Sequence, residues 1–396
     1  MTDVRLAVAS SAGSIVGWLS QRAGRGHGET IRGRVIDALD PRAISKLAIG
    51  RDIVIVSGTN GKTTTTAHLA AILAQGTDEG VSTSNFGANM RSGIAAALAQ
   101  RPRHRLVVLE CDELYLPEMY QILKPKVIVL LNLSRDQLDR TGEVRKVANL
   151  WRESFIHDDV SFVIDRDDPF LEYAVAGAGH VVRVTFGGRK HPDAATCPAC
   201  MQLLDWSTGD YRCGCGLGSH ISQVRADRTL LGPARNTVLA IEAARLMGAI
   251  VPVEQAQAFT ANAPDRVMHF QIRECVVATR LAKNPESWRA ALAGISAPNV
   301  VLSVNARGVD GRDTSWLWDI DYRALVGKKV VCTGQRRLDV AYRLSVQGID
   351  VTTADTFDAA VLAIGPAEEI EAIASFTAFQ DLVAAQMGLS KARNGA

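Results

Sequence analysis

The sequence predicts an α/β protein built on mostly parallel sheets, and two observations carry this prediction. Short apolar runs alternate with helical patterns from about residue 45 to residue 262, and the alternation starts again after that point. Apolar runs of about four to six residues between helices are typical of parallel strands covered on both faces. We therefore expect a helical lead-in (residues 1–44), a central domain (45–262) with an insertion at 194–222, and a C-terminal Rossmann-like α/β domain (263–396).

The lead-in has an amphipathic pattern from Leu6 to Leu19, which predicts a helix that packs on the next domain. A position on a membrane surface is the alternative for this helix. The first residues lack the basic start and long apolar core of a signal peptide, and no apolar run is long enough for a membrane span. The net charge of +2 does not point to nucleic acid as a partner. We expect a cytoplasmic protein.

The central domain begins with the expected strand 52–58 and helix 62–75. The pattern then predicts these further elements: helix 92–100, strand 105–110, strand 126–133, strand 161–169 and helix 236–249. In the C-terminal domain it predicts helix 285–294, strand 299–305, strand 329–334 and helix 338–348.

The segment "SGTNGKTTTT" is typical of a phosphate-binding loop between a strand and a helix. Gly58 and Gly61 let backbone N–H groups converge on an anion, and the helix N-terminus adds partial positive charge. Lys62 can reach the β- and γ-phosphates of a nucleotide, and Thr63 can ligate magnesium. The spacing differs from the common motif, because Val56 stands where its first glycine would be. An ordinary glycine turn before a helix is the alternative.

Magnesium requires a second hard ligand, and Glu110 is the best candidate because it ends the predicted strand 105–110. Asp112 and Glu113 follow it. Asp136 and Asp139 follow the next strand, and ligands of parallel sheets bind at these carboxyl ends. A solvated strand end is the alternative for the acidic residues.

Four of the seven cysteines lie close together, as Cys197-x-x-Cys200 and Cys213-x-Cys215. Two close pairs of thiols are typical of a structural zinc ribbon with four ligands and no open position. The second pair is one residue short, so His220 or His191 is an alternative ligand. A ribbon that binds nucleic acid is a further alternative, but no basic patch surrounds these cysteines. We expect Cys111, Cys275 and Cys332 to be small buried residues.

The motifs "GTNGKTTT", "NLSRDQLDRTGE", "DRDDP" and "GPARNTVLAIEAA" resemble, in this order, the central ATPase domain of Mur ligases and folylpolyglutamate synthases. The resemblance implies that ATP activates a carboxylate as an acyl phosphate, which an amine then attacks. It assigns magnesium to Thr63 and Glu110. The residues that it assigns to ATP are Thr59, Asn60, Gly61, Lys62, Thr63, Thr64, Asn236 and Arg266.

The cysteine insertion and the C-terminal segments "NARGVDGRDTSWLWDIDY" and "CTGQRRLDVAYRLSVQGI" resemble the MurT-type ligase subunits of lipid II isoglutaminyl synthases. This resemblance implies amidation of the D-glutamate α-carboxylate of the lipid II stem peptide at the inner face of the membrane. It also implies a heterodimer with a GatD-type glutamine amidotransferase that supplies ammonia. Asp313 is the first choice for a residue that completes the partner's catalytic set, ahead of Asp310 and Asp319.

Two other functions stay open from the sequence. One is a ligase that joins an amino acid to a soluble carboxylate, as the folylpolyglutamate synthases do. The other is a zinc-ribbon scaffold whose ATP site regulates assembly. Dependence of ATP hydrolysis on lipid II and ammonia would separate these functions from the amidation.

Overall fold

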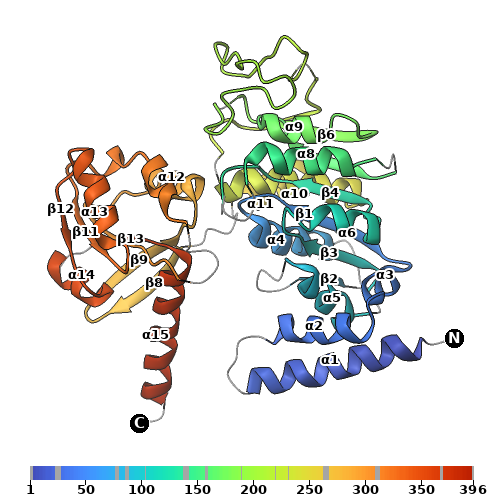
Figure 1. Ribbon diagram of the computed structural model, residues 1–396, viewed down its shortest axis with the longest axis horizontal. Helices are drawn as coiled ribbons and strands as arrows, with labels where there is room; N and C mark the ends of the chain where they lie inside the picture. The colour runs from blue at the N-terminus through green and yellow to red at the C-terminus, as the bar shows by residue number, and fades with distance from the viewer. Residues whose placement is uncertain are drawn as a thin grey trace. The chain divides into compact units, whose positions relative to one another are not determined.

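The computed structural model contains two α/β units, each with its own sheet and core (Figure 1). The first comprises Met1–Ser134 and Glu143–Pro264, and the second comprises Arg135–Gly142 and Asp265–Ala396. The structure describes residues 3–22, 28–75, 80–84, 89–102, 104–136, 142–156, 159–188, 190–218, 220–230, 232–261, 267–307, 313–365 and 369–394.

The first unit contains a seven-stranded sheet in the order β2-β3-β1-β4-β5-β6-β7, and all its neighbouring strands are parallel. The strands are β1 (Asp52–Ser57), β2 (Val81–Thr83), β3 (Leu106–Glu110), β4 (Val127–Leu130), β5 (Ser161–Asp165), β6 (His180–Thr185) and β7 (Val224–Arg225). The chain runs from β1 to one side of the sheet and later returns to its other side with β4. The strand order therefore reverses at β1, which is where open parallel sheets bind ligands.

Helices cover both faces of this sheet, as the continuous apolar strands predict. The described helices of the unit are α1 (Val4–Arg22), α2 (Glu29–Leu39), α3 (Ala43–Ala48), α4 (Lys62–Ala74), α5 (Arg91–Gln100), α6 (Leu116–Leu123), α8 (Val144–Ser154), α9 (Pro169–Ala174), α10 (Gly232–Leu246) and α11 (Val253–Ala261). Side chains alternate along β1: Ile53 and Ile55 pack with α5, α6 and α8, whereas Val54 and Val56 pack with α4 and α10. The predicted α/β class with a parallel sheet is confirmed.

The second unit contains a six-stranded mixed sheet in the order β12-β11-β10-β13-β9-β8. Its elements are β8 (Val267–Ile272), β9 (Cys275–Leu281), α12 (Pro285–Ala293), β10 (Asn299–Ser303), the 3-10 helices η2 (Ser315–Asp319) and η3 (Arg323–Leu325), β11 (Lys329–Thr333), α13 (Arg337–Val346), β12 (Val351–Thr353), α14 (Phe357–Ile364), β13 (Ile370–Ala374) and α15 (Phe376–Asn394). Only the β8–β9 pair is antiparallel, and the sequence patterns did not predict this hairpin.

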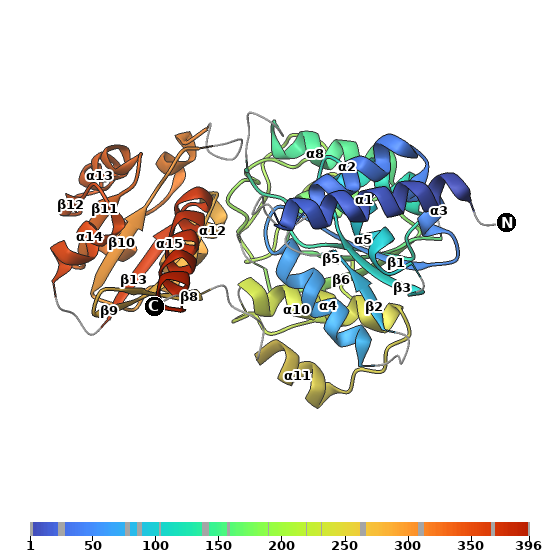
Figure 2. The ribbon, with the colours of Figure 1, turned by 90° about the horizontal axis from the view of Figure 1, so that it is seen from below.

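The expected helix at Leu6–Leu19 forms the larger part of α1. Helix α2 lies between α1 and α5, so the lead-in is layered onto the first unit through two helix contacts (Figures 1 and 2). None of the described helices is both long enough and apolar enough to cross a bilayer.

The contact between α2 and α5 leaves no room for a side chain at Gly33. A Cβ atom built on Gly33 would lie 1.7 Å from the carbonyl oxygen of Ser92 at the start of α5. Because the obstacle is backbone, the two helices must separate to accept even a methyl group.

We predict that Gly33→Ala lowers the free energy of unfolding of the first unit by about 2 kcal/mol, the usual cost of overpacking. Urea denaturation of the full chain measures this change. The control is Gly177→Ala, because a Cβ atom at Gly177 meets nothing within 4 Å and the residue does not have a positive φ. Equal denaturation midpoints for the two variants would contradict the tight α2–α5 contact.

Candidate functional site

The loop after β1 has the backbone geometry of a phosphate cradle. Gly58 has a φ of 133° and Gly61 a φ of 87°, values that side chains rarely allow. Space also requires glycine, since a Cβ atom on Gly61 would lie 2.0 Å from Nδ2 of Asn236. Helix α4 begins directly after Gly61, so the N–H groups of its first turn face the loop.

The segment that follows β4 fixes this loop from the neighbouring strand. The Thr59 N–H donates to the carbonyl oxygen of Asn132 at 2.9 Å. The side-chain amide of Asn132 bonds both backbone groups of Asn60, at 2.9 and 3.0 Å. The Ser134 N–H donates to Oγ1 of Thr59 at 3.0 Å. The sequence patterns did not identify Asn132 and Ser134 as site residues, although both follow closely after a buried strand, a position that could have identified them.

Lys62 is a buried residue whose ammonium group is held inside the loop. Its Nζ donates to the carbonyl oxygens of Gly58 and Thr59 and lies 3.0 Å from Oε2 of Glu113. Both side chains of the ion pair are 7% exposed. A buried charge needs such a partner, and Glu113 supplies it from the segment after β3. Trp151 fixes that segment through a 2.8 Å bond from Nε1 to the carbonyl oxygen of Glu113.

Glu110 is the last residue of β3, and it pairs in register with Val56 of β1. Its carboxylate is buried and accepts a hydrogen bond from Nδ2 of Asn89 at 3.3 Å. Thr63 lies in the first turn of α4, so both predicted magnesium ligands stand at the carboxyl ends of neighbouring strands. Magnesium is bound in proteins by one or two such oxygens together with substrate phosphates. The residues present therefore fit this cation.

Cys111 follows Glu110 and is fully buried. Burial, and then the charges of Asp112 and Glu113, raise the pKa of its thiol. The thiol therefore stays protonated, which agrees with the expectation that Cys111 packs rather than reacts.

The "DRDDP" motif begins at the end of β5 and connects that strand to the phosphate loop and to α10. Asp168 caps α9 and accepts the Leu133 N–H at 2.7 Å, next to the residues that hold the phosphate loop. Arg235 lies 2.6 Å from Asp165 and 3.1 Å from Asp167. Burial raises the pKa of Asp165 to about 6 despite this partner. Arg235 therefore anchors the start of α10, the helix that brings Asn236 to Gly61.

The four cysteines of the insertion come together between β6 and β7. The Sγ atoms of Cys197, Cys200, Cys213 and Cys215 all lie within 4.8 Å of one another, and among the described residues no other group of three or more His, Cys, Asp or Glu has this geometry. The closest pairs are Cys200–Cys213 at 3.3 Å and Cys197–Cys215 at 3.6 Å. Four converging thiols suit a tetrahedral metal.

The two histidines considered as substitute ligands lie elsewhere. His220 pairs with Glu172 at 2.5 Å, and Nε2 of His191 lies 3.6 Å from Asp168. The second cysteine pair is one residue shorter than a C-x-x-C pair, but it still places Cys215 in the cluster.

Asp313 lies in the second unit, two residues before η2 begins. Its Oδ1 accepts hydrogen bonds from the backbone and the hydroxyl of Ser315, at 2.9 and 2.6 Å. Asp319 pairs with Arg135 at 2.9 Å. Asp310, Arg266 and Asp139 lie outside the described residues.

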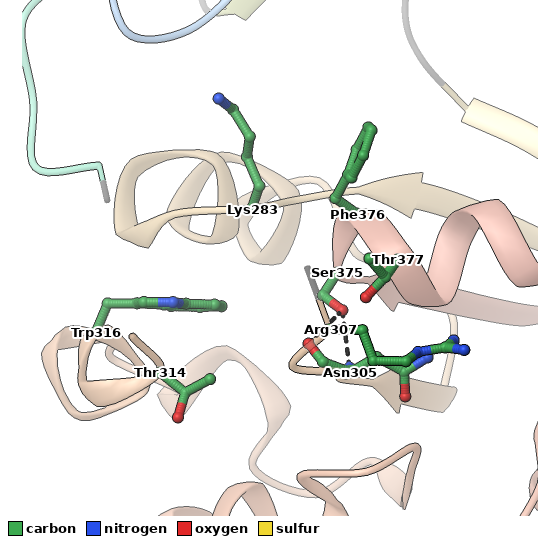
Figure 3. A pocket seen from close by; sticks show the side chains of 8 residues that line it. All are labelled: Lys283, Asn305, Arg307, Thr314, Trp316, Ser375, Phe376 and Thr377. Atoms are coloured by element: carbon green, nitrogen blue, oxygen red, sulfur yellow. Dashed lines mark hydrogen bonds between the residues drawn. The ribbon is translucent and has the colours of Figure 1, made fainter. Parts of the chain in front are cut away.

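A pocket that the sequence patterns did not identify lies at the carboxyl ends of β9, β10 and β13, and Thr314, the residue after Asp313, is part of its lining (Figure 3). Ser375 joins two of these strand ends, since its hydroxyl bonds both the N–H and the carbonyl oxygen of Asn305. The pocket is lined by Lys283, Asn305, Arg307, Thr314, Trp316, Ser375, Phe376 and Thr377. It combines two cationic side chains with two aromatic ones.

Two solved structures illustrate the fold that this chain shares. MurF from Acinetobacter baumannii matches with a TM-score of 0.62 and 18% identity, over 90% of this chain and 80% of that one. Escherichia coli FolC matches with a TM-score of 0.56 and 17% identity, over 89% of this chain and 92% of that one. At these identities the comparison shows a Mur ligase-like fold alone.

Sequence comparison is more specific. The Mur ligase middle domain matches residues 56–199, and the MurT ligase C-terminal domain matches residues 281–379. A lipid II isoglutaminyl synthase (glutamine-hydrolyzing) subunit MurT from Staphylococcus aureus is 27% identical over 84% of this chain and 87% of that protein. The Streptococcus pneumoniae counterpart is 28% identical over 82% and 83%. The chain therefore contains a Mur ligase middle domain followed by a MurT ligase C-terminal domain, and its likeness to the MurT subunits extends along most of its length.

Proposed function

We propose that this protein is the ligase subunit of an enzyme that amidates the α-carboxylate of D-glutamate in the lipid II stem peptide. The observation that carries the proposal is the phosphate cradle around the buried Lys62, in a chain similar to MurT subunits along most of its length. The cradle supports phosphoryl transfer, and the names of the relatives give lipid II as the substrate and glutamine as the source of nitrogen.

The reaction has two steps. A carboxylate oxygen attacks the γ-phosphorus of ATP, the bond to the β,γ-bridging oxygen breaks, and ADP leaves. Ammonia then attacks the carbon of the acyl phosphate, phosphate leaves, and loss of a proton gives the amide. Lys62, the loop N–H groups from residues 59–64 and the N-terminus of α4 stabilise the charge of the transferred phosphoryl group.

Thr63 and Glu110 would hold magnesium, which when bound neutralises phosphate charge. Glu113 is a positioning residue in this scheme, because it fixes the ammonium of Lys62 beneath the loop. Asn236 closes the loop from α10, and we propose that Arg266 contributes to ATP binding from the domain junction. The four cysteines would hold a structural zinc ion.

The ammonia comes from a GatD-type glutamine amidotransferase in this proposal, since the relatives are subunits of a glutamine-hydrolysing enzyme. We propose that Asp313 completes the active site of that partner by orienting a catalytic histidine. The protein would work in the cytoplasm at the inner face of the membrane, where a lipid-linked substrate is accessible.

The ligase role predicts a strong effect of Lys62→Met on ADP release that depends on lipid II and ammonia. Loss of one preorganised cation should slow this reaction by about 100-fold or more. The double variant Lys62→Met/Glu113→Gln separates chemistry from folding, because it leaves no unpaired buried charge. It should bind the partner normally and be equally inactive.

The matched control is Lys126→Met, which removes an exposed lysine that pairs with Asp52. Full activity of the Lys62 variants would contradict the ligase role. ADP release that requires an amino acid and a soluble carboxylate would indicate the alternative ligase, and release without any acceptor would indicate the regulatory scaffold.

The role of Asp313 is testable through the partner. Asp313→Asn should slow glutamine hydrolysis by the complex by roughly 10⁴-fold, as expected when a histidine loses its orienting carboxylate. Added ammonium chloride should restore amidation, because the ATP site is unchanged. Asp321→Asn is the control, since Asp321 accepts the N–H of Arg323 in a similar turn. Unchanged glutamine hydrolysis in Asp313→Asn would remove this residue from the mechanism.

The cysteine cluster predicts one zinc ion per chain, measured by mass spectrometry of the metal content. Cys200→Ser should lower the zinc content and the melting temperature, because metal binding contributes folding free energy. Cys275→Ser, outside the cluster, should change neither. A chain purified with zinc supplied but without stoichiometric metal would contradict a zinc site.

A further inference from the structure

Most of the large apolar side chains of α1 lie on the face that points away from the protein. Five of them, Val4, Val8, Ile15, Trp18 and Leu19, are between 52% and 74% exposed, and we call them the outer stripe. At about 100° per residue they fall within one sector of the helix roughly 100° wide. The buried residues of the helix are Ala9, Gly13 and Gly17, which lie on the opposite side.

This arrangement is the reverse of an ordinary surface helix, which turns its large apolar residues toward the core and its polar residues toward water. Scattered single apolar residues on a surface are common, but five large apolar residues in one sector of a single helix indicate an interaction site. Figure 2 shows the outer side of α1, with α2 and the sheet of the first unit behind it.

The packing of α1 on α2 prevents the helix from rolling to bury the stripe. A Cβ atom on Gly13 would lie 2.7 Å from Cγ1 of Ile36, and one on Gly17 would lie 3.1 Å from the carbonyl oxygen of Gly28. The inner face of α1 therefore accepts no side chain at Gly13 or Gly17, and the outer stripe is presented in a fixed orientation.

The N-terminal segment that contains α1 is positively charged. Residues 1–51 contain eight lysines and arginines and four acidic residues, a net charge of +4 in a chain whose total is +2. Arg5, Arg22, Arg34 and Arg42 are exposed, and the described part of the chain shows no ion pair for any of them. The guanidinium of Arg22 lies over the Trp18 ring, 4.7 Å from its centre.

We propose that the outer stripe docks on an anionic lipid surface, with α1 lying in the plane of the membrane. Apolar side chains that include tryptophan, together with flanking arginines, are the chemistry that binds the interface of an anionic bilayer. The helix is not apolar enough to span, so it lies on the surface. The inference rests on the proposed function in one respect: a lipid-linked substrate requires the protein to act at a membrane surface.

The test uses the full chain with its partner subunit and vesicles that contain no lipid II. The complex should sediment with vesicles of phosphatidylglycerol and phosphatidylethanolamine in equal parts, and not with phosphatidylcholine vesicles. Ile15→Ser/Leu19→Ser should weaken this binding at least tenfold, and so should raised salt. Brominated lipids should quench tryptophan fluorescence in the wild type and not in Trp18→Phe.

The control is Ile250→Ser, which removes an apolar side chain that is 92% exposed elsewhere in the same unit. Equal vesicle binding by the stripe variant and the control would overturn the proposal. Loss of the partner subunit from Ile15→Ser/Leu19→Ser would also overturn it, since the stripe would then be a protein interface. Amidation of detergent-solubilised lipid II tests the proposed function separately, because it requires no membrane.

Discussion

A buried ammonium group must be neutralised where it lies, and at Lys62 this requirement organises the carboxyl edge of the central sheet. The charge is met by Glu113 and by carbonyl oxygens of the loop itself. Glu113 in turn depends on Trp151 of α8 to hold its backbone. A single cation thus connects α4, the segment after β3 and a helix on the other face of the sheet.

Close backbone contacts complete this edge, and they explain why small residues and amides recur there. The side chain of Asn132 bonds both the N–H and the carbonyl oxygen of Asn60. The loop can approach the end of β4 this closely because Gly58 has no side chain. Asn236 rests on Gly61 where a methyl group would not fit. Asp168 extends the same network to α9 through Leu133. The loop is therefore held by strands and helices on both sides before any ligand contributes.

The local sequence pattern was sufficient to predict β1, β3, β5 and α4. Apolar runs and glycines within each segment define these elements, so no residue distant in sequence is needed to recognise them. Glycine spacing and the cysteine pairs likewise predicted the phosphate loop and the thiol cluster. The partners of these residues could not be predicted in the same way. Glu113 meets Lys62 across 51 positions, and Asn132 meets Asn60 across 72, so only the strand order brings them together.

Contacts between residues far apart in sequence also explain what could not be predicted for the second unit and for α1. The β8–β9 hairpin lacks a strong turn signal, and the pocket at β9, β10 and β13 depends on three strand ends far apart in sequence. The sequence pattern predicted a helix at α1, but it did not show which face is buried. Small residues decide that face, because only they permit the close approach to α2.

The position of the cysteine insertion has a consequence for how the family can vary. It connects β6 to β7 at the border of the sheet, and β7 has only two residues. Strands β4, β5 and β6 separate this border from β1. The Cys213–Cys215 pair can therefore be one residue shorter than a C-x-x-C pair without shifting any central strand. Changes in length at a sheet border are tolerated far better than changes at its centre. The insertion can therefore diverge in sequence while the register that aligns Val56 with Glu110 stays intact.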